Sequence, residues 1–323
     1  MNPIFGLFFF LIGYVIVYYS VDYLIDEVEE YTERFNLSPM VFGILILGLD
    51  FEESVASIFG AINGLPQLSI GNLVGNTVMA LIISFALPFI FTPSIYEGVD
   101  SIYLYFVSIC GISLACSVLF PSYLVLFSTV NLVVYFAILY ISYQKQKSYT
   151  KKKTQTGSDE NSDENSETDD DDDEGNLTIQ SLRLILIVIM VIAGGELLVR
   201  GAEDLISFTH ISESFFGLVI MAFVTNVEEF WIMFKAIQKN QVQLGLSIGI
   251  GKILWNISII FGICGLLIVQ YTPDNGLILS TLVFLIGLLT LTGSLLLKSF
   301  NKPVSYVLMA LFFVFLVINF LNI

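Results

Sequence analysis

Apolar runs of 18 or more residues recur along the whole chain, and no other feature limits its possible folds so strongly. Each run is long enough to cross a hydrocarbon core about 30 Å thick. Because 56% of the 323 residues are hydrophobic and only 13% are charged, a soluble core of this size could not bury them. The sequence therefore predicts an all-α polytopic membrane protein with ten transmembrane helices. The expected spans are 3–22, 39–62, 67–91, 101–119, 121–142, 181–200, 213–237, 242–271, 276–297 and 303–322.

The first apolar run and the cysteines fit this class. The start, MNPIFGLFFF, has no basic residues and no small-residue cleavage site, so we expect a first span and not a removable signal. Cys110, Cys116 and Cys264 all fall within predicted spans, and we expect them to pack there without forming disulfides or binding metal.

One stretch without an apolar pattern, residues 143–180, separates the fifth and sixth predicted spans. It carries five lysines followed by eleven acids, a composition that predicts a disordered linker, with calcium-dependent regulation as the alternative. Lysines beside a span favour the cytoplasm, which places this acidic loop inside and both termini outside the cell. The expected domains are residues 1–142 and 181–323, each a five-helix repeat.

An internal repeat relates these two halves. The segment LSPMVFGILILGLDFEESVASIFGAINGLPQLSIGNLVGNTVMALI (37–82) aligns with ISESFFGLVIMAFVTNVEEFWIMFKAIQKNQVQLGLSIGIGKILWNI (211–257). Glu53 precedes Gly75 by 22 residues, and Glu229 precedes Gly251 by the same number. Because five spans per half is an odd number, the halves must insert in opposite orientations. Inverted repeats of this kind are typical of secondary transporters, whose site lies near the midplane.

Acidic residues inside predicted spans are the strongest functional signal. A charged residue at mid-membrane costs about 3 kcal/mol and by default marks an ion or proton pathway. Helical spacing places two polar sets on equivalent faces: Asp50, Glu53 and Ser57 in the first repeat, and Thr225, Asn226 and Glu229 in the second. Such oxygen ligands suit Ca²⁺, Na⁺ or Mg²⁺, and no histidine or cysteine joins them. The structural alternative is that the acids pair with a buried lysine or with the backbone.

These residues resemble the alpha repeats of the Ca²⁺/cation antiporter superfamily, which includes Na⁺/Ca²⁺ and H⁺/Ca²⁺ exchangers. The resemblance covers nearly all of the membrane part, including FNLSPMVFG, GAINGLPQLSIGNLVGN and GGELLVRGAEDLIS. The family pattern G-T-S-x-P-E corresponds here to GLDFEE at 48–53 and to VTNVEE at 224–229.

The resemblance implies a divalent-cation site built from both repeats. By position its ligands are the paired carboxylates Glu53 and Glu229, the flanking Asp50 and Asn226, and the backbone carbonyls of Leu49 and Thr225. The chain departs from the family pattern at Glu52 and Glu228 (proline in the family), at Asn76 and Lys252 (serine), and at Ala80, whereas Asn256 keeps a polar ligand. Glu52 and Glu228 are expected at a second subsite or in a cytosolic vestibule. Because the serine and the polar ligand help to form Na⁺ sites in sodium-coupled members, the changes bear on the coupling ion.

Lys252 admits three interpretations. Its ammonium could take the place of a Na⁺ as a tethered cation, or it could carry a proton together with Glu229. Alternatively, it could extend to the membrane interface and play no part in the site.

The function that the sequence predicts is secondary antiport of a divalent cation, Ca²⁺ first, against H⁺ or Na⁺ by alternating access. Asp50, Glu53 and Glu229 together with Lys252 carry two net negative charges, which match one divalent ion. The alternatives are exchange of Mg²⁺ or another divalent ion, and a cation-binding sensor that does not transport. An enzyme is disfavoured, because a single intramembrane aspartate and no Ser–His or metal–His set are present. We expect no cofactor and no nucleic acid, but contact with membrane lipid and a monomeric state.

Overall fold

The computed structural model describes residues 3–33, 50–91, 100–156, 173–223, 226 and 242–322. Within these ranges the chain is helical apart from short connecting segments such as 268–274. Six of the described helical segments are long and apolar enough to cross a membrane: Ser101–Leu119, Pro121–Lys145, Ile185–Thr209, Leu246–Leu267, Asn275–Leu296 and Lys302–Leu321. The protein is therefore an all-helical integral membrane protein.

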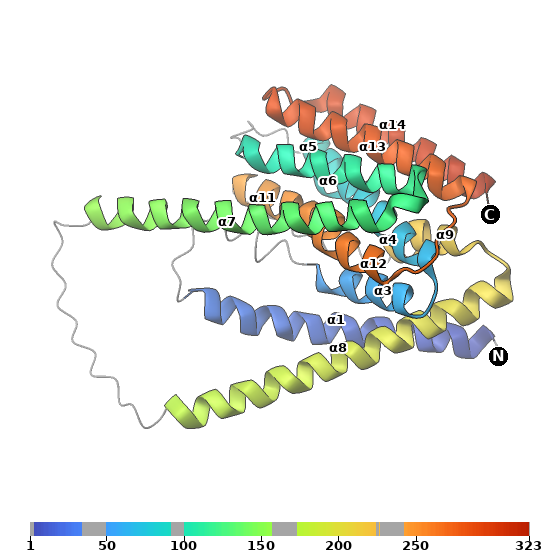
Figure 1. Ribbon diagram of the computed structural model, residues 1–323, viewed down its shortest axis with the longest axis horizontal. Coiled ribbons are helices and arrows are strands. Elements are labelled where there is room, and N and C mark those ends of the chain that lie inside the picture. Colours follow the sequence, from blue (N-terminus) through green and yellow to red (C-terminus); the bar gives the residue numbers. More distant parts are fainter. Residues whose placement is uncertain are drawn as a thin grey trace.

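The helices follow the expected order along the chain (Figure 1). The first half contains α1 (Pro3–Glu33), α3 (Phe51–Ile62), α4 (Pro66–Ala80), α5 (Leu87–Phe91), α6 (Ser101–Leu119) and α7 (Leu124–Thr156). The second half contains α8 (Asp173–Thr209), α9 (Glu213–Phe215), α11 (Val242–Leu254), α12 (Phe261–Leu267), α13 (Asn275–Leu296) and α14 (Lys302–Leu321). Three π-helical segments continue these helices: η2 (Leu81–Ala86) after α4, η4 (Phe216–Met221) after α9, and η5 (Trp255–Ile260) after α11.

Three helices, α1, α7 and α8, extend beyond the predicted spans. Helix α7 continues to Thr156 and α8 begins at Asp173, so both ends of the segment 143–180 are helical. Lysine and glutamine end an apolar run but favour helix, so α7 continues past its membrane part. Residues 157–172 lie outside the described residues.

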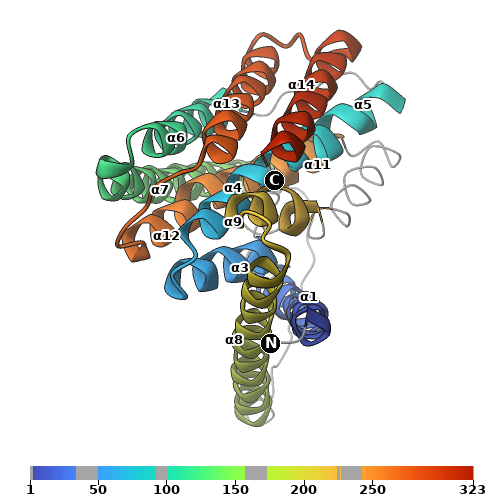
Figure 2. The same ribbon diagram turned by 90° about the vertical axis from the view of Figure 1, so that its right-hand side faces the viewer.

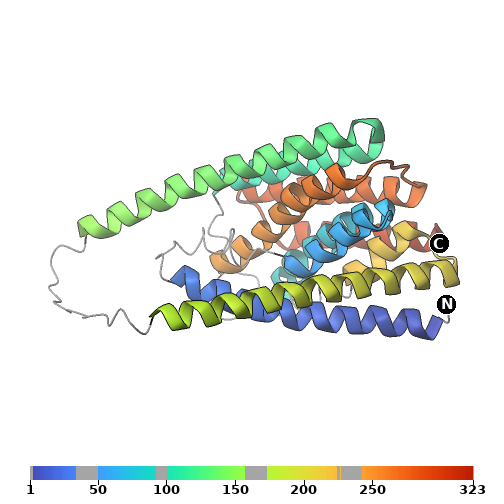
Figure 3. The same ribbon diagram turned by 60° about the horizontal axis from the view of Figure 1, so that its bottom comes forward.

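Helices α1 and α8 run antiparallel and form a pair along one side of the molecule (Figures 1 and 3). Glycines permit their close approach. A Cβ atom on Gly13 would lie 2.3 Å from the backbone nitrogen of Leu198, and one on Gly201 would lie 2.3 Å from that of Phe10. Small residues are typical of such contacts in membranes, where helices associate through packing.

Helix α4 lies at the centre of the molecule and crosses η4 of the second half (Figure 2). Its residues from Leu68 to Ala80 are all buried. A Cβ on Gly75 would lie 2.2 Å from the carbonyl oxygen of Leu218, and one on Gly217 would lie 2.5 Å from that of Leu68. The two halves thus meet backbone to backbone at this crossing.

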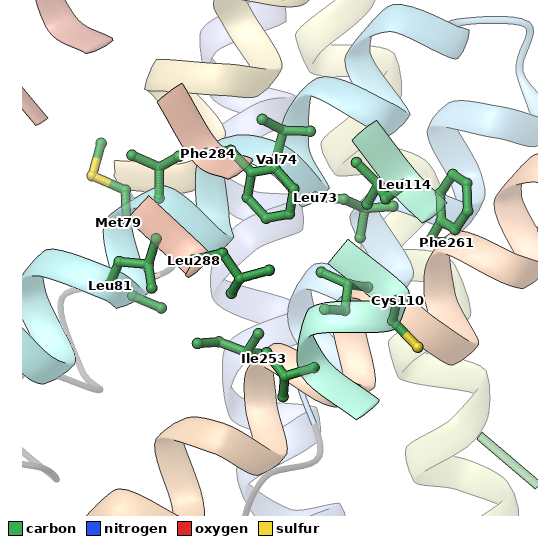
Figure 4. Close-up of a cluster of buried hydrophobic side chains, with 14 of the residues drawn as sticks. Leu73, Val74, Met79, Leu81, Cys110, Leu114, Ile253, Phe261, Phe284 and Leu288 are labelled. Atoms are coloured by element: carbon green, nitrogen blue, oxygen red, sulfur yellow. The ribbon is translucent and has the colours of Figure 1, made fainter. Parts of the chain in front are cut away.

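The surrounding core joins α4, α6, α12 and α13 (Figure 4). Leu73, Leu114, Phe261 and Phe284 are among its fully buried side chains. Cys110 and Cys264 are also buried, and all three cysteines are free, as expected from the sequence. Because lipid tails are as apolar as these side chains, the core contributes chiefly van der Waals packing.

The start of α4 is fixed by contacts with the second half. Gly64 (φ 77°) makes the preceding turn. Pro66 lies in the first turn of α4, where a backbone N–H has no partner within the helix, so proline loses no hydrogen bond there. A Glu213 carboxylate oxygen accepts a hydrogen bond from the Leu68 backbone N–H at 2.9 Å. At this same end of the molecule lie both chain termini, whereas the end of α7 and the start of α8 lie at the other (Figure 1).

Candidate cation-binding site

Two buried carboxylates open helix α3. Asp50 is the N-cap, and its Oδ1 accepts a hydrogen bond from the Glu53 backbone N–H at 3.3 Å. The cap therefore sets Asp50 and Glu53 one turn apart on the same helix face. The Glu53 side chain is fully buried, and the N-terminal end of a helix favours negative charge.

Lys252 and Asn256, one turn apart in the second half, each contact both acids. The Lys252 ammonium lies 2.9 Å from Asp50 Oδ2 and 3.0 Å from Glu53 Oε1. The Asn256 amide donates to Asp50 Oδ2 at 3.1 Å and to Glu53 Oε2 at 2.8 Å. Since Lys252 is only 5% exposed, its extension to the membrane interface is ruled out in this structure.

Asn226 and Asn76 complete the described cluster. The Asn226 amide nitrogen lies 3.3 Å from Glu53 Oε1 and 2.7 Å from Asn76 Oδ1. Both asparagine side chains are fully buried. The cluster therefore draws Asp50, Glu53 and Asn76 from the first half and three donors from the second.

Two amide oxygens of this cluster, Asn226 Oδ1 and Asn256 Oδ1, have no hydrogen-bond partner among the described residues. A buried polar atom without a partner costs about 1–3 kcal/mol. Carbonyl-type oxygens beside carboxylates are the ligands that hard cations prefer. The cluster therefore contains oxygen atoms of two chemical kinds, carboxylate and amide, and both kinds are ligands of hard cations.

Trp255 fixes the backbone around Asp50 and is a residue that sequence reasoning missed. Its indole N–H lies 2.8 Å from Ser54 Oγ and 3.3 Å from the Asp50 carbonyl oxygen. The indole ring also packs edge-on against Phe51 and Tyr135. Its position immediately before Asn256 was the only sequence signal that pointed to it.

Asn72 was missed as well, although it lies one turn before Asn76 on α4. Its amide donates to Ser57 Oγ at 2.9 Å, and both side chains are fully buried. Ser57, which the helical spacing singled out, therefore bonds to α4.

The structure brings together six of the residues singled out from the sequence: Asp50, Glu53, Asn76, Asn226, Lys252 and Asn256. Glu52 is only partly buried, in keeping with its different direction from the same turn as Glu53. Leu49, Thr225, Glu228 and Glu229 lie outside the described residues, so their proposed roles stay predictions.

Curated relatives of the chain are membrane proteins. The uncharacterized membrane protein MJ0091 of Methanocaldococcus jannaschii is 26% identical over 246 residues, which cover 73% of this chain and 74% of that protein. The inner membrane protein YrbG of Escherichia coli is 21% identical over 260 residues, covering 80% and 78%.

Solved structures of the sodium-calcium exchanger NCX_Mj share the fold. The form soaked with 100 mM Na⁺ and 10 mM Sr²⁺ superimposes with a TM-score of 0.58 at 20% identity, covering 97% of both chains. The form soaked with 2.5 mM Na⁺ and 0.1 mM Ca²⁺ gives a TM-score of 0.57 at 20% identity, covering 96% of both.

A family model extends the likeness to each half separately. The model described as sodium/calcium exchanger protein matches residues 5–144 and residues 180–321, which together make up most of the chain. The two matched blocks leave out the acidic segment between the halves. The chain belongs to the sodium/calcium exchanger protein family.

Proposed function

We propose that the protein is a secondary active antiporter that exchanges a divalent cation, Ca²⁺ before others, for H⁺ or Na⁺ by alternating access. The family is one of membrane cation exchangers and not of enzymes. The observation that carries the proposal is the pair of buried carboxylates, Asp50 and Glu53, held between the two halves. Burying two acids inside a membrane protein is costly unless they serve a cation pathway.

The proposed ligands come from both halves. Glu53 and Glu229 are the central carboxylates, Asp50, Asn226, Asn76 and Asn256 flank them, Leu49 and Thr225 offer backbone carbonyls, and Glu52 and Glu228 lie nearer a vestibule. With Lys252 as a coupling residue, the three central acids retain two negative charges, which one divalent ion neutralises. The unpartnered oxygens of Asn226 and Asn256 support this set.

The proposed architecture is ten helices in two inverted five-helix repeats, with the substrate near the bilayer midplane. The antiparallel pair α1 and α8, the first helix of each half, supports this arrangement (Figure 1). So does the odd number of spans per half. The lysines at the end of α7 favour a cytoplasmic acidic loop, which puts both termini outside the cell.

A flux measurement tests the proposal. The protein is reconstituted in proteoliposomes, and uptake of radiolabelled Ca²⁺ is followed with an outward Na⁺ gradient or an outward H⁺ gradient. Uptake under either gradient that the Glu229→Gln variant loses supports the proposal and identifies the counter-ion. If neither gradient moves Ca²⁺, calcium is not the substrate, and the same assay with Mg²⁺ tests the alternative ion. A protein that binds Ca²⁺ but moves no cation would be a sensor.

A further inference from the structure

The position of Lys252 bears on how many ions the protein exchanges. Its ammonium bridges the two buried acids, at 2.9 Å from Asp50 and 3.0 Å from Glu53. It thus lies where a bound cation would contact both carboxylates. A hydrated Lys at the rim would leave that position open, but this side chain is buried.

A purely structural ion pair explains this placement poorly. Burying both ions of a pair costs desolvation energy, and replacing such a pair by apolar residues is often neutral or stabilising. The matched position of the first half carries Asn76, an uncharged residue that is also fully buried. The shared helix frame therefore does not require a charge at this position.

The lysine reduces the negative charge of the site when no substrate ion is bound. With its acids ionised, the site carries two negative charges on Asp50 and Glu53 and a third on the proposed ligand Glu229, and the bridging ammonium lowers the total to two. An uncompensated charge at the centre of a bilayer is costly, so the empty site must be neutralised before it crosses. An antiporter without the lysine would need one more monovalent cation to return its empty carboxylates across the membrane.

We propose that Lys252 is an internal counter-ion: its ammonium occupies the space between Asp50 and Glu53 when the substrate has left and replaces one transported monovalent cation in the return step. The proposal rests on the antiport function proposed above. The flexible four-carbon stem lets the ammonium withdraw from the carboxylates when a divalent ion binds. While the ammonium lies between the carboxylates, no additional monovalent cation has to bind to compensate that one negative charge.

The test is the ion stoichiometry of the reconstituted full-length protein, with radiolabelled Ca²⁺ and the counter-ion that drives its uptake. The reversal potential is measured for the parent protein and for Lys252→Gln, Lys252→Arg and Lys145→Gln. Lys145 is a matched control, because its ion pair with Asp100 lies outside the cluster. We expect Lys252→Gln to need about one more monovalent ion per Ca²⁺, because it loses one positive charge. Lys252→Arg and Lys145→Gln should keep the parent ratio.

A second readout covers a variant that folds but does not transport. Displacement of Ca²⁺ by Na⁺ or H⁺ from the purified protein should then show a Hill coefficient higher by about one in Lys252→Gln, since one more charge must be replaced. An unchanged ratio and an unchanged Hill coefficient would overturn the proposal.

Two further outcomes are neutral variants that do not fold and a parent protein that does not transport. Lys252→Asn, which copies Asn76 of the first half, is the second neutral variant. If Lys252→Arg folds while both neutral variants do not, the ion pair is structural and the proposal is wrong. If the parent protein moves no cation at all, the antiport function itself fails, and that result is separate from the stoichiometry.

Discussion

Residues at matched positions of the two halves differ in what they bring to the cluster. At one offset of 176 residues, Asp50 corresponds to Asn226, Asn76 to Lys252, and Ala80 to Asn256. Among the described residues, the first half supplies both carboxylates, whereas the second half supplies an ammonium and two amide donors. At these described positions the repeats thus divide the chemistry between acceptors in the first half and donors in the second, whereas the proposed second-half carboxylate Glu229 lies outside the described residues.

The difference separates two properties of the molecule: the packing of its helices, called the frame below, and the charge of the side chains in the cluster. The frame depends on close helix crossings, such as Gly75 against the backbone of Leu218. The charge depends on a few side chains that can change without moving a helix. Substitutions that make the halves alike in chemistry should therefore impair ion binding before they impair folding.

The largest effect is expected from Glu53→Gln. It removes the carboxylate that accepts hydrogen bonds from Lys252, Asn226 and Asn256. Breaking a buried charge pair costs about 3–5 kcal/mol, so Ca²⁺ affinity and uptake should fall by more than about 100-fold. Uptake into proteoliposomes checks this. Glu203→Gln, on an exposed position of α8, is the control and should keep parent uptake. Near-parent uptake by Glu53→Gln would remove Glu53 from the pathway.

The next effect comes from Asp50→Asn, which gives the first half the residue of the second. Asparagine is as good an N-cap as aspartate, so α3 and the thermal stability should change little. The lost charge should weaken Ca²⁺ binding by about 10–100-fold, the range for hydrogen bonds to charged groups. Calorimetric titration with Ca²⁺ measures this, and a large loss of thermal stability without loss of affinity would contradict the division.

A smaller effect, on the frame alone, is expected from Gly75→Ala. The new Cβ would lie 2.2 Å from the Leu218 carbonyl oxygen, so α4 and η4 must separate. Overpacking of this kind costs about 1–3 kcal/mol, which thermal unfolding in detergent detects. Gly293→Ala is the matched control, because no atom lies within 4 Å of its Cβ position. Equal stability of the two variants would argue against a tight crossing.

The smallest effect is expected from Asn256→Ala, which copies Ala80 of the first half. Each acid loses one amide donor but keeps Lys252. A loss of about 1 kcal/mol, or roughly fivefold in Ca²⁺ affinity, follows from the ordinary worth of a hydrogen bond. The same titration measures it. A loss as large as that of Glu53→Gln would mean that Asn256 is a principal ligand.

Much of the cluster was predictable because the repeat places matched residues at related points. The offset that pairs Asn76 with Lys252 also singled out Asn226 and Asn256. The structure brings Lys252, Asn226 and Asn256 to the acids, and Asn76 accepts a hydrogen bond from Asn226. The contact between Lys252 and both carboxylates was one of three alternatives, because the sequence does not show where a long side chain extends.

Other features depend on contacts that no local pattern carries. Trp255 is apolar in any hydropathy plot, and only the folded helices bring its indole N–H to Ser54. The Glu213 carboxylate caps α4 across 145 positions of the chain. The ends of α1 and α7 were predicted at residues 22 and 142, but the helices run to Glu33 and Thr156. Apolar content marks the membrane part of a helix and not its end.

A crystal structure of the protein soaked with Sr²⁺, with anomalous scattering used to locate the ion, would show whether the buried acids bind a divalent cation. We expect a peak that contacts Glu53 and the flanking Asp50, with carboxylate oxygens at about the Ca²⁺ distances of 2.3–2.6 Å, Glu229 as a further ligand, and the Lys252 ammonium withdrawn from at least one acid. Saturating Sr²⁺ with no peak there, and Lys252 still bridging both carboxylates, would contradict this prediction.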